Sequence, residues 1–79
     1  MRAIVYIRLK TEVLDPQGQA IESALKNLGE NNINNIRQGK LIEMDIEAKN
    51  TEEAEEKIEK ITKSLLANTV IEEYSIEIS

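Results

Sequence analysis

The chain has 79 residues, of which 10 are basic and 15 acidic, giving a formal net charge of −5. Phosphate backbones are bound by a concentrated excess of Lys and Arg, so this balance argues against a nucleic-acid partner. There is no cysteine or histidine, and a chain this short buries one small core without disulfides or a metal to support it. We therefore expect one domain, residues 1–79, stabilised by self-association.

The compartment follows from the same features. The absence of cysteine suits a reducing environment, and no apolar run of about 18 residues or signal-peptide pattern is present. We therefore expect a cytoplasmic protein with no membrane partner.

Residues 2–10 alternate in the manner of a β-strand. One side carries Ala3, Val5, Ile7 and Leu9, and the other carries Arg2, Ile4, Tyr6, Arg8 and Lys10. Ile4 and Tyr6 thus place apolar surface among charges. A face of this kind is usually covered by a partner, although two exposed residues without a role would look the same.

Residues 13–29 have the pattern of a capped helix. Asp15 can accept hydrogen bonds from the first-turn N–H groups, and Pro16 suits the first helical position. Gly29 follows where a left-handed C-terminal cap is expected. One face is apolar, with Ala20, Ile21, Ala24, Leu25 and Leu28 at helical spacing. We predict that this face is buried.

Gly18 is unexpected in the first turn of this helix, where glycine costs about 1 kcal/mol relative to alanine. One interpretation is that another group must approach the backbone at this point. The other is that glycine merely relaxes the entry into the helix.

Residues 33–38 and 40–47 are predicted to form two strands joined by a tight turn at Gly39. The second strand places Ile42, Met44 and Ile46 on one face and Glu43, Asp45 and Glu47 on the other. Three carboxylates in alternation could bind a metal or act as a general acid and base. With no histidine and no second ligand cluster, a solvated or partner-facing surface is favoured.

A second helix begins after Asn50, which forms a capping-box pattern with Glu53, and Thr51 is a substitute cap. Its apolar seam is Ala54, Ile58, Ile61 and Leu65. Acidic residues precede lysines by four positions along its other face, which indicates a solvated surface. Residues 66–69 end the helix, and residues 70–78 form the last strand.

The predicted order is strand, helix, strand, strand, helix, strand. This order is typical of a ferredoxin-like α+β sandwich, in which two helices cover one face of a four-stranded antiparallel sheet. No internal repeat or low-complexity linker interrupts the chain.

The sequence offers little for catalysis. No serine lies in a Gly-x-Ser-x-Gly elbow, and the three glycines are too far apart for a phosphate-binding loop. The features left unexplained are the helix entrance at residues 15–18, the turn at residues 37–40 and the partly apolar sheet face. All three indicate surfaces for protein partners.

Three segments carry a resemblance to a known family. Residues 13–20 read Val-Leu-Asp-Pro-Gln-Gly-Gln-Ala, residues 36–43 read Ile-Arg-Gln-Gly-Lys-Leu-Ile-Glu, and residues 65–78 form the third. Together they closely resemble the small PurS subunit of phosphoribosylformylglycinamidine synthase, over nearly the whole chain. The sequence departs from the family pattern at Thr69, where proline is usual, and at Glu12, where glycine is frequent.

The resemblance implies a function. The family's complex makes formylglycinamidine ribonucleotide from formylglycinamide ribonucleotide, glutamine and ATP in purine biosynthesis. A glutaminase subunit releases ammonia, and a synthetase subunit uses ATP and magnesium. The small subunit, a homodimer or a tetramer when isolated, binds no cofactor, has no catalytic residues and joins the two. Keeping the active sites together prevents loss of ammonia as ammonium.

The resemblance also implies roles for the unexplained residues. A helix-entry surface for a partner subunit would comprise Asp15, Pro16, Gln17 and Gly18. A second contact at the turn would comprise Arg37, Gly39 and Lys40, and the dimer face would include Ile4 and Tyr6.

Two other classes stay open. A small dimeric isomerase or cyclase would have to use Glu43, Asp45 or Tyr74 as its acid and base. A dimeric regulatory module would bind a small metabolite at the dimer interface.

Overall fold

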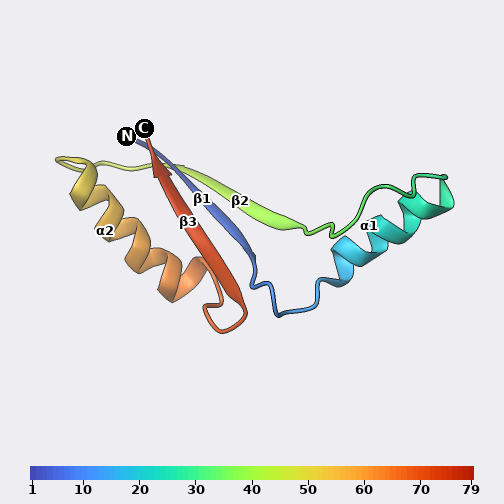
Figure 1. Ribbon diagram of the computed structural model, residues 1–79. Helices are drawn as coiled ribbons and strands as arrows, with labels where there is room; N and C mark the ends of the chain where they lie inside the picture. The colour runs from blue at the N-terminus through green and yellow to red at the C-terminus, as the bar shows by residue number, and fades with distance from the viewer.

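A computed structural model describes the whole chain, Met1–Ser79. Three strands and two helices follow one another along the chain (Figure 1). Their bounds are β1 Arg2–Leu9, α1 Pro16–Asn27, β2 Gly39–Asp45, α2 Thr51–Ile61 and β3 Glu72–Ile78, and a π-helical turn, Thr62–Leu66, directly continues α2.

The strands form one antiparallel sheet in the order β2-β1-β3, so the first strand lies in the middle. Val5 at its centre is paired with Ile42 on β2 and with Ile76 on β3. The alternation predicted for residues 2–10 is confirmed, because Ala3, Val5 and Ile7 are buried on one face. We call this the inner face of the sheet, and the opposite face the outer face.

Helix α2 covers the inner face (Figure 1). Its Ile58 is fully buried in one cluster with Ala3, Val5 and Ile7. The predicted start of α2 is confirmed, because the Asn50 side chain accepts a hydrogen bond of 2.8 Å from the Glu53 N–H. Two of its four predicted seam residues, Ala54 and Ile58, are fully buried.

The fourth seam residue, Leu65, is 78% exposed, so its predicted burial is wrong. The cause is the π-helical turn, in which the Ala67 N–H bonds to the carbonyl of Thr62, five residues back. The wider turn shifts the helical periodicity, and Thr62 is buried in place of the leucine.

The predicted strand at residues 33–38, and with it the hairpin and the fourth strand of the sheet, is absent. Asn35 has a φ of 57°, which breaks an extended backbone. Gly39 is not in the left-handed region that a tight hairpin turn requires, and it is instead the first residue of β2, paired with Arg8. The chain therefore runs into β2 without reversing direction.

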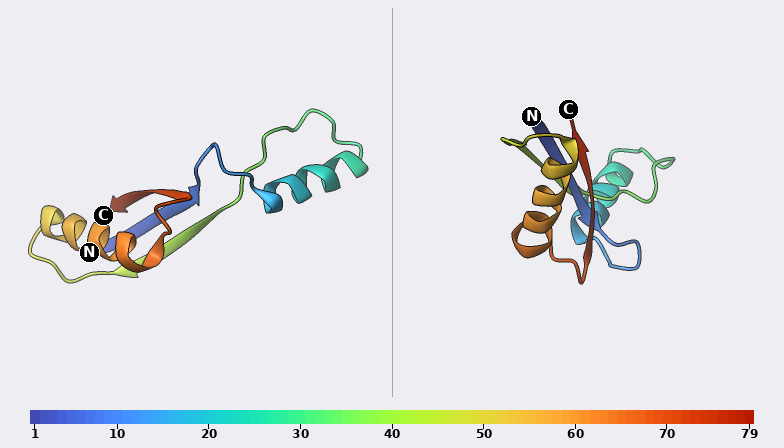
Figure 2. Two further views of the ribbon diagram at one scale, coloured as in Figure 1. Left: turned by 90° about the horizontal axis from the view of Figure 1, so that it is seen from below. Right: turned by 90° about the vertical axis from the view of Figure 1, so that its left-hand side faces the viewer.

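The predicted burial of α1 on the sheet is also wrong. Figures 1 and 2 show α1 beyond the end of the sheet, so that only α2 covers the inner face. The molecule measures 52 × 25 × 14 Å, and its radius of gyration is 16.1 Å, whereas a compact chain of this length has a radius of about 12 Å. We call residues 10–38, which contain α1, the arm.

We predict that Ile58→Ala lowers the free energy of unfolding by about 2–5 kcal/mol, because it leaves a cavity in the only apolar cluster of the sheet. Urea unfolding at one fixed protein concentration measures this loss. Leu65→Ala removes an equally large but exposed side chain and should change stability by less than about 0.5 kcal/mol. Equal losses in the two variants would contradict the described core.

Candidate functional site: the junction between the sheet and the arm

The Asp15 carboxylate joins two segments that are distant in sequence. One oxygen, Oδ1, accepts a hydrogen bond of 3.0 Å from the Gly18 N–H and so caps α1, as predicted. The other, Oδ2, accepts a hydrogen bond of 2.7 Å from the Gln38 N–H, just before β2. Asp15 is only 4% exposed, so both bonds are shielded from water. We call residues 9–18 together with residues 36–39 the junction.

Hydrogen bonds to the charged form hold the pKa of Asp15 below its ordinary value. The largest contribution is the Gln38 N–H, followed by the Gly18 N–H, and the Arg37 charge acts in the same direction. The carboxylate is therefore ionised at neutral pH and accepts from both sides of the junction.

Gly18 is buried at the junction because the backbone of Ile36 lies directly against it. A Cβ atom at residue 18 would overlap the carbonyl oxygen of Ile36. Of the two interpretations of this glycine, the close approach of another group is thus confirmed, and the group belongs to the same chain.

Arg37 also acts within the junction. Its Nη2 donates hydrogen bonds of 2.9 Å to the carbonyls of both Lys10 and Val13, in the loop that leads to α1. Gly39 allows β2 to approach β1, since a Cβ there would lie 2.6 Å from the Ile7 carbonyl oxygen. All of these contacts lie within one chain and support the arm.

The structure separates the sequence-predicted contact residues into two groups. Asp15, Gly18, Arg37 and Gly39 meet at the junction and hold it together. Of these four, Asp15 and Gly18 are buried, whereas Arg37 and Gly39 are exposed. The other three residues, Pro16, Gln17 and Lys40, are also exposed, and the Lys40 ammonium lies 3.4 Å from the Glu72 carboxylate. Sequence reasoning missed Ile36 and Gln38, which act through backbone groups and therefore leave no side-chain signal.

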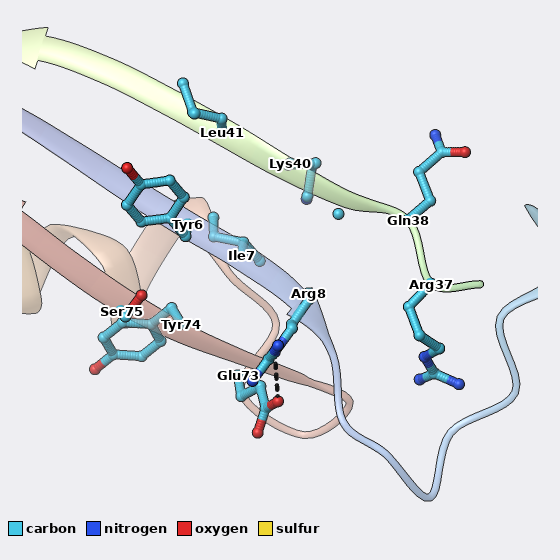
Figure 3. Close-up of a pocket in the computed structure, with 11 residues that line it drawn as sticks. Tyr6, Ile7, Arg8, Arg37, Gln38, Lys40, Leu41, Glu73, Tyr74 and Ser75 are labelled. Atoms are coloured by element: carbon cyan, nitrogen blue, oxygen red, sulfur yellow. Dashed lines mark hydrogen bonds and ion pairs between the residues drawn. The ribbon is translucent and has the colours of Figure 1, made fainter. Parts of the chain in front are cut away.

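A hollow of about 670 Å³ lies beside the junction, at the end of the sheet (Figure 3). Arg8, Arg37 and Lys40 contribute its cationic side chains. Each is already engaged, Arg8 with Glu73 at 2.8 Å, Lys40 with Glu72, and Arg37 with backbone carbonyls. The hollow is therefore lined by cations that already have partners within the chain. Binding of a small metabolite, the alternative function, stays a prediction.

Ion pairs between neighbouring strands lie on the outer face of the sheet. Arg2 bridges Glu43 at 3.1 Å and Asp45 at 3.2 Å, so two of the carboxylates considered for metal or acid-base chemistry are paired with a cation. These contacts raise the pKa of Arg2, the bond to Asp45 most strongly.

The two predicted dimer-face residues lie within this polar surface. Ile4 is half-buried, and Tyr6 is 40% exposed. The Tyr6 hydroxyl donates a hydrogen bond of 2.9 Å to Glu77, and this bond raises the pKa of the tyrosine. A dimer contact through Ile4 and Tyr6 stays a prediction.

The apolar side chains with the largest exposed fractions lie on the arm and between α2 and β3, and Leu41, which is 54% exposed, is paired with Tyr6 on the sheet. Leu14 and Leu28 are 63% and 78% exposed on the arm, and Val70 is 79% exposed in the loop. Exposed apolar side chains of this kind favour contacts with other protein chains.

Neither helix has the length and apolar character needed to cross a membrane.

Comparison with known proteins identifies the family. The model of the PurS family, described as phosphoribosylformylglycinamidine (FGAM) synthase, matches residues 2–79. The chain belongs to the PurS family. Its relatives include the phosphoribosylformylglycinamidine synthase subunit PurS of Mycobacterium leprae, which is 49% identical over 75 residues, covering 95% of this chain and 91% of the relative.

Solved structures of PurS proteins have the same fold. The crystal structure of Methanocaldococcus jannaschii PurS superposes with a TM-score of 0.91 at 41% identity, covering 99% of this chain and 94% of that one. A chain in the structure of PurLQS from Thermotoga maritima superposes with a TM-score of 0.88 at 33% identity, covering 96% and 93%. The three-stranded sheet and two helices described above are therefore the fold of this family.

We predict that Gly18→Ala destabilises the protein by roughly 2 kcal/mol or more, because the added methyl group would overlap the Ile36 carbonyl. Urea unfolding measures the change, and Gln17→Ala, at the exposed neighbouring position, is the control. An exposed helical glycine would show the opposite sign, with alanine stabilising by up to about 1 kcal/mol. Stabilisation would show that no close approach exists.

The pKa of Asp15 predicts an acid-sensitive junction. Because its pKa is lowered by folding, the carboxylate stabilises the protein above the unfolded pKa of about 3.9, and this contribution disappears as pH falls further through the folded pKa. Between pH 6 and the acid limit of folding, the urea midpoint of Asp15→Asn should fall less steeply than that of the native chain.

The control for this pH series is Glu30→Gln, which removes an exposed carboxylate after α1. Its midpoint should follow the native curve. A slope for Asp15→Asn that equals the native slope would contradict the role of the carboxylate in the junction.

Proposed function

We propose that this chain is the small, non-catalytic subunit of phosphoribosylformylglycinamidine synthase and joins its glutaminase and synthetase subunits. The observation that carries the proposal is the likeness to PurS proteins over residues 2–79. One of the similar chains belongs to the structure of PurLQS from Thermotoga maritima. Methanocaldococcus jannaschii PurS is a subunit of formylglycinamide ribonucleotide amidotransferase in the purine biosynthetic pathway, and this chain takes the same place in the proposal.

The physical task of such a subunit is to hold two active sites in one assembly. Ammonia released into neutral water becomes ammonium and loses its nucleophilic lone pair, so transfer between sites has to exclude bulk water. ATP and magnesium would be used by the synthetase subunit, and this subunit would contribute binding surfaces.

The exposed junction residues support contacts with the partner subunits. Pro16 and Gln17 lie at the helix entrance, where Asp15 and Gly18 fix the backbone by buried contacts. Lys40, the residue after the junction, lines one hollow together with Gln17. A rigid entrance presents the exposed side chains without a large loss of conformational entropy on binding. In this proposal the buried residues position the surface and the exposed residues touch the partner.

We also propose that the subunit is a homodimer in the cytoplasm. Only nine of its 79 residues are buried, and its accessible surface is 5,848 Å². A compact monomer of 9.0 kDa would expose about 4,900 Å². The excess of about 1,000 Å² is close to the roughly 800 Å² that each partner contributes to a standard interface.

The test of the bridging role uses purified synthetase and glutaminase subunits, with and without this chain. We predict that the chain restores glutamine-dependent synthesis and leaves ammonia-dependent synthesis unchanged, since only the first requires transfer between sites. Failure to change either rate, with no binding to either subunit, would contradict the proposal. Saturable binding of a nucleotide or amino acid by titration calorimetry would then favour the metabolite-binding alternative.

Two neighbouring glutamines give a matched pair for the partner surface. Gln17 is in the predicted contact set and Gln19 is not, and both are exposed in the first turns of α1. Gln17→Arg should weaken assembly by about tenfold, whereas Gln19→Arg should not. The readout is the concentration of chain that gives half of the glutamine-dependent rate, and equal shifts would remove Gln17 from the interface.

A further inference from the structure

Two adjacent leucines at the end of α2 compete for one place on the sheet. Leu66 is half-buried and packs against the core cluster, whereas Leu65 is 78% exposed. Leu65 follows the buried Ile58 by seven residues, which is about two turns of a regular α-helix. A regular helix would therefore bury Leu65, and the register of the last turn decides which leucine the core receives.

The π-helical turn, at the end of α2 next to the loop that leads to β3, sets the observed register (Figure 1). In it the Ala67 N–H donates a hydrogen bond of 2.9 Å to the carbonyl of Thr62, five residues back. A π-type bond spans one residue more than an α-type bond, so the residues of this turn are rotated backwards around the helix axis. Leu66 thus occupies the place that the α-helical register gives to Leu65.

The observed register carries a cost in free energy. Thr62 is fully buried, and its hydroxyl oxygen has no hydrogen-bond partner. A buried polar group without a partner loses its bonds to water and gains nothing in return. In a regular α-helix a threonine hydroxyl can bond to the carbonyl four residues back, which is that of Ile58.

The α-helical register gives up contacts of a similar size. It buries Leu65 and exposes Leu66, so one leucine side chain is covered in either register. The π-helical register in turn keeps Ala67, which is 8% exposed, in the core cluster. Because the registers differ only by such single contacts, their free energies lie close together.

The loop after the helix can follow a change of register. The N–H groups of Ile71 and Glu72 bond to the Asn68 carbonyl at 3.1 and 2.7 Å, and the Val70 N–H bonds to the Asn68 side chain at 3.1 Å. These bonds close residues 68–72 into a turn of their own. A change of register is therefore confined to the end of the helix and leaves the sheet in place.

We propose that the end of α2 is a two-register switch, in which Leu65 and Leu66 exchange places in the core. The π-helical register exposes Leu65, and the α-helical register withdraws it and exposes Leu66. A chain that binds Leu65 stabilises the first register, since a ligand shifts an equilibrium toward the state that it binds better. The inference depends neither on the homodimer nor on the bridging role.

A double-mutant cycle between the two leucines, measured by urea unfolding, tests the switch. Leu65→Ala should change the folding equilibrium constant by no more than about twofold, and Leu66→Ala should lower it by less than about tenfold, since the remaining leucine fills the core in each case. The double variant should lose at least about tenfold more than the product of the two single losses.

The matched control combines Leu65→Ala with Ile42→Ala. Ile42 also packs against the core cluster but lies on β2, so this pair should show only the product of its single losses. A product of single losses for Leu65 and Leu66 as well would overturn the switch.

A second measurement uses only one substitution, so it decides the question even where the double variant does not fold. Nuclear Overhauser contacts between the methyl groups of Leu65 and Ile58 should be stronger in Leu66→Ala than in the native chain. A folded Leu66→Ala chain without these contacts would overturn the switch, because Leu65 would then have stayed outside the core.

Discussion

The two hydrogen bonds of the Asp15 carboxylate fix how the arm leaves the sheet. One fixes where α1 begins, and the other holds the residue before β2 against that helix start. Because the carboxylate is shielded from water, these bonds do not exchange readily with solvent. Gly18 makes the contact possible by leaving room for the Ile36 backbone, and Arg37 joins the same segments from the other side. The arm consequently leaves the sheet in a fixed direction.

That direction leaves the core unfinished. The whole chain buries only nine residues, including Asp15 and Gly18 at the junction, while α1 exposes the face that a second layer would normally cover. Small domains without disulfides or metals commonly obtain the missing stability by association. The same exposed surfaces suit a subunit whose work is to bind other chains, so the stability of this protein and its proposed function depend on one feature, the extended arm.

Much of the fold could be predicted because its signals are local. The Asp15 and Asn50 caps and the alternation in β1 each involve residues close in sequence, and all three are confirmed. The strand expected at residues 33–38 is absent because Asn35 has a positive φ, and because the N–H groups of Asn35 and Gln38 bond to the side chains of Glu22 and Asp15 instead of to a neighbouring strand. The π-helical turn had no sequence signal, and it displaced Leu65 from the core. The α1 stripe correctly indicated an apolar face, but periodicity does not say which chain covers it.

At the candidate site, the sequence indicated which residues are unusual, but it did not indicate what those residues contact. The sequence singled out Asp15, Gly18 and Arg37 as candidates for a partner contact, and the structure shows that each also makes contacts inside the chain. The central claim is that α1 depends on a second chain, and amide hydrogen exchange of Ala20–Asn27 at several protein concentrations tests it most directly. The account predicts protection comparable to that of β1 at high concentration, lost on dilution together with the dimer. Protection that persists in a monomer would contradict it.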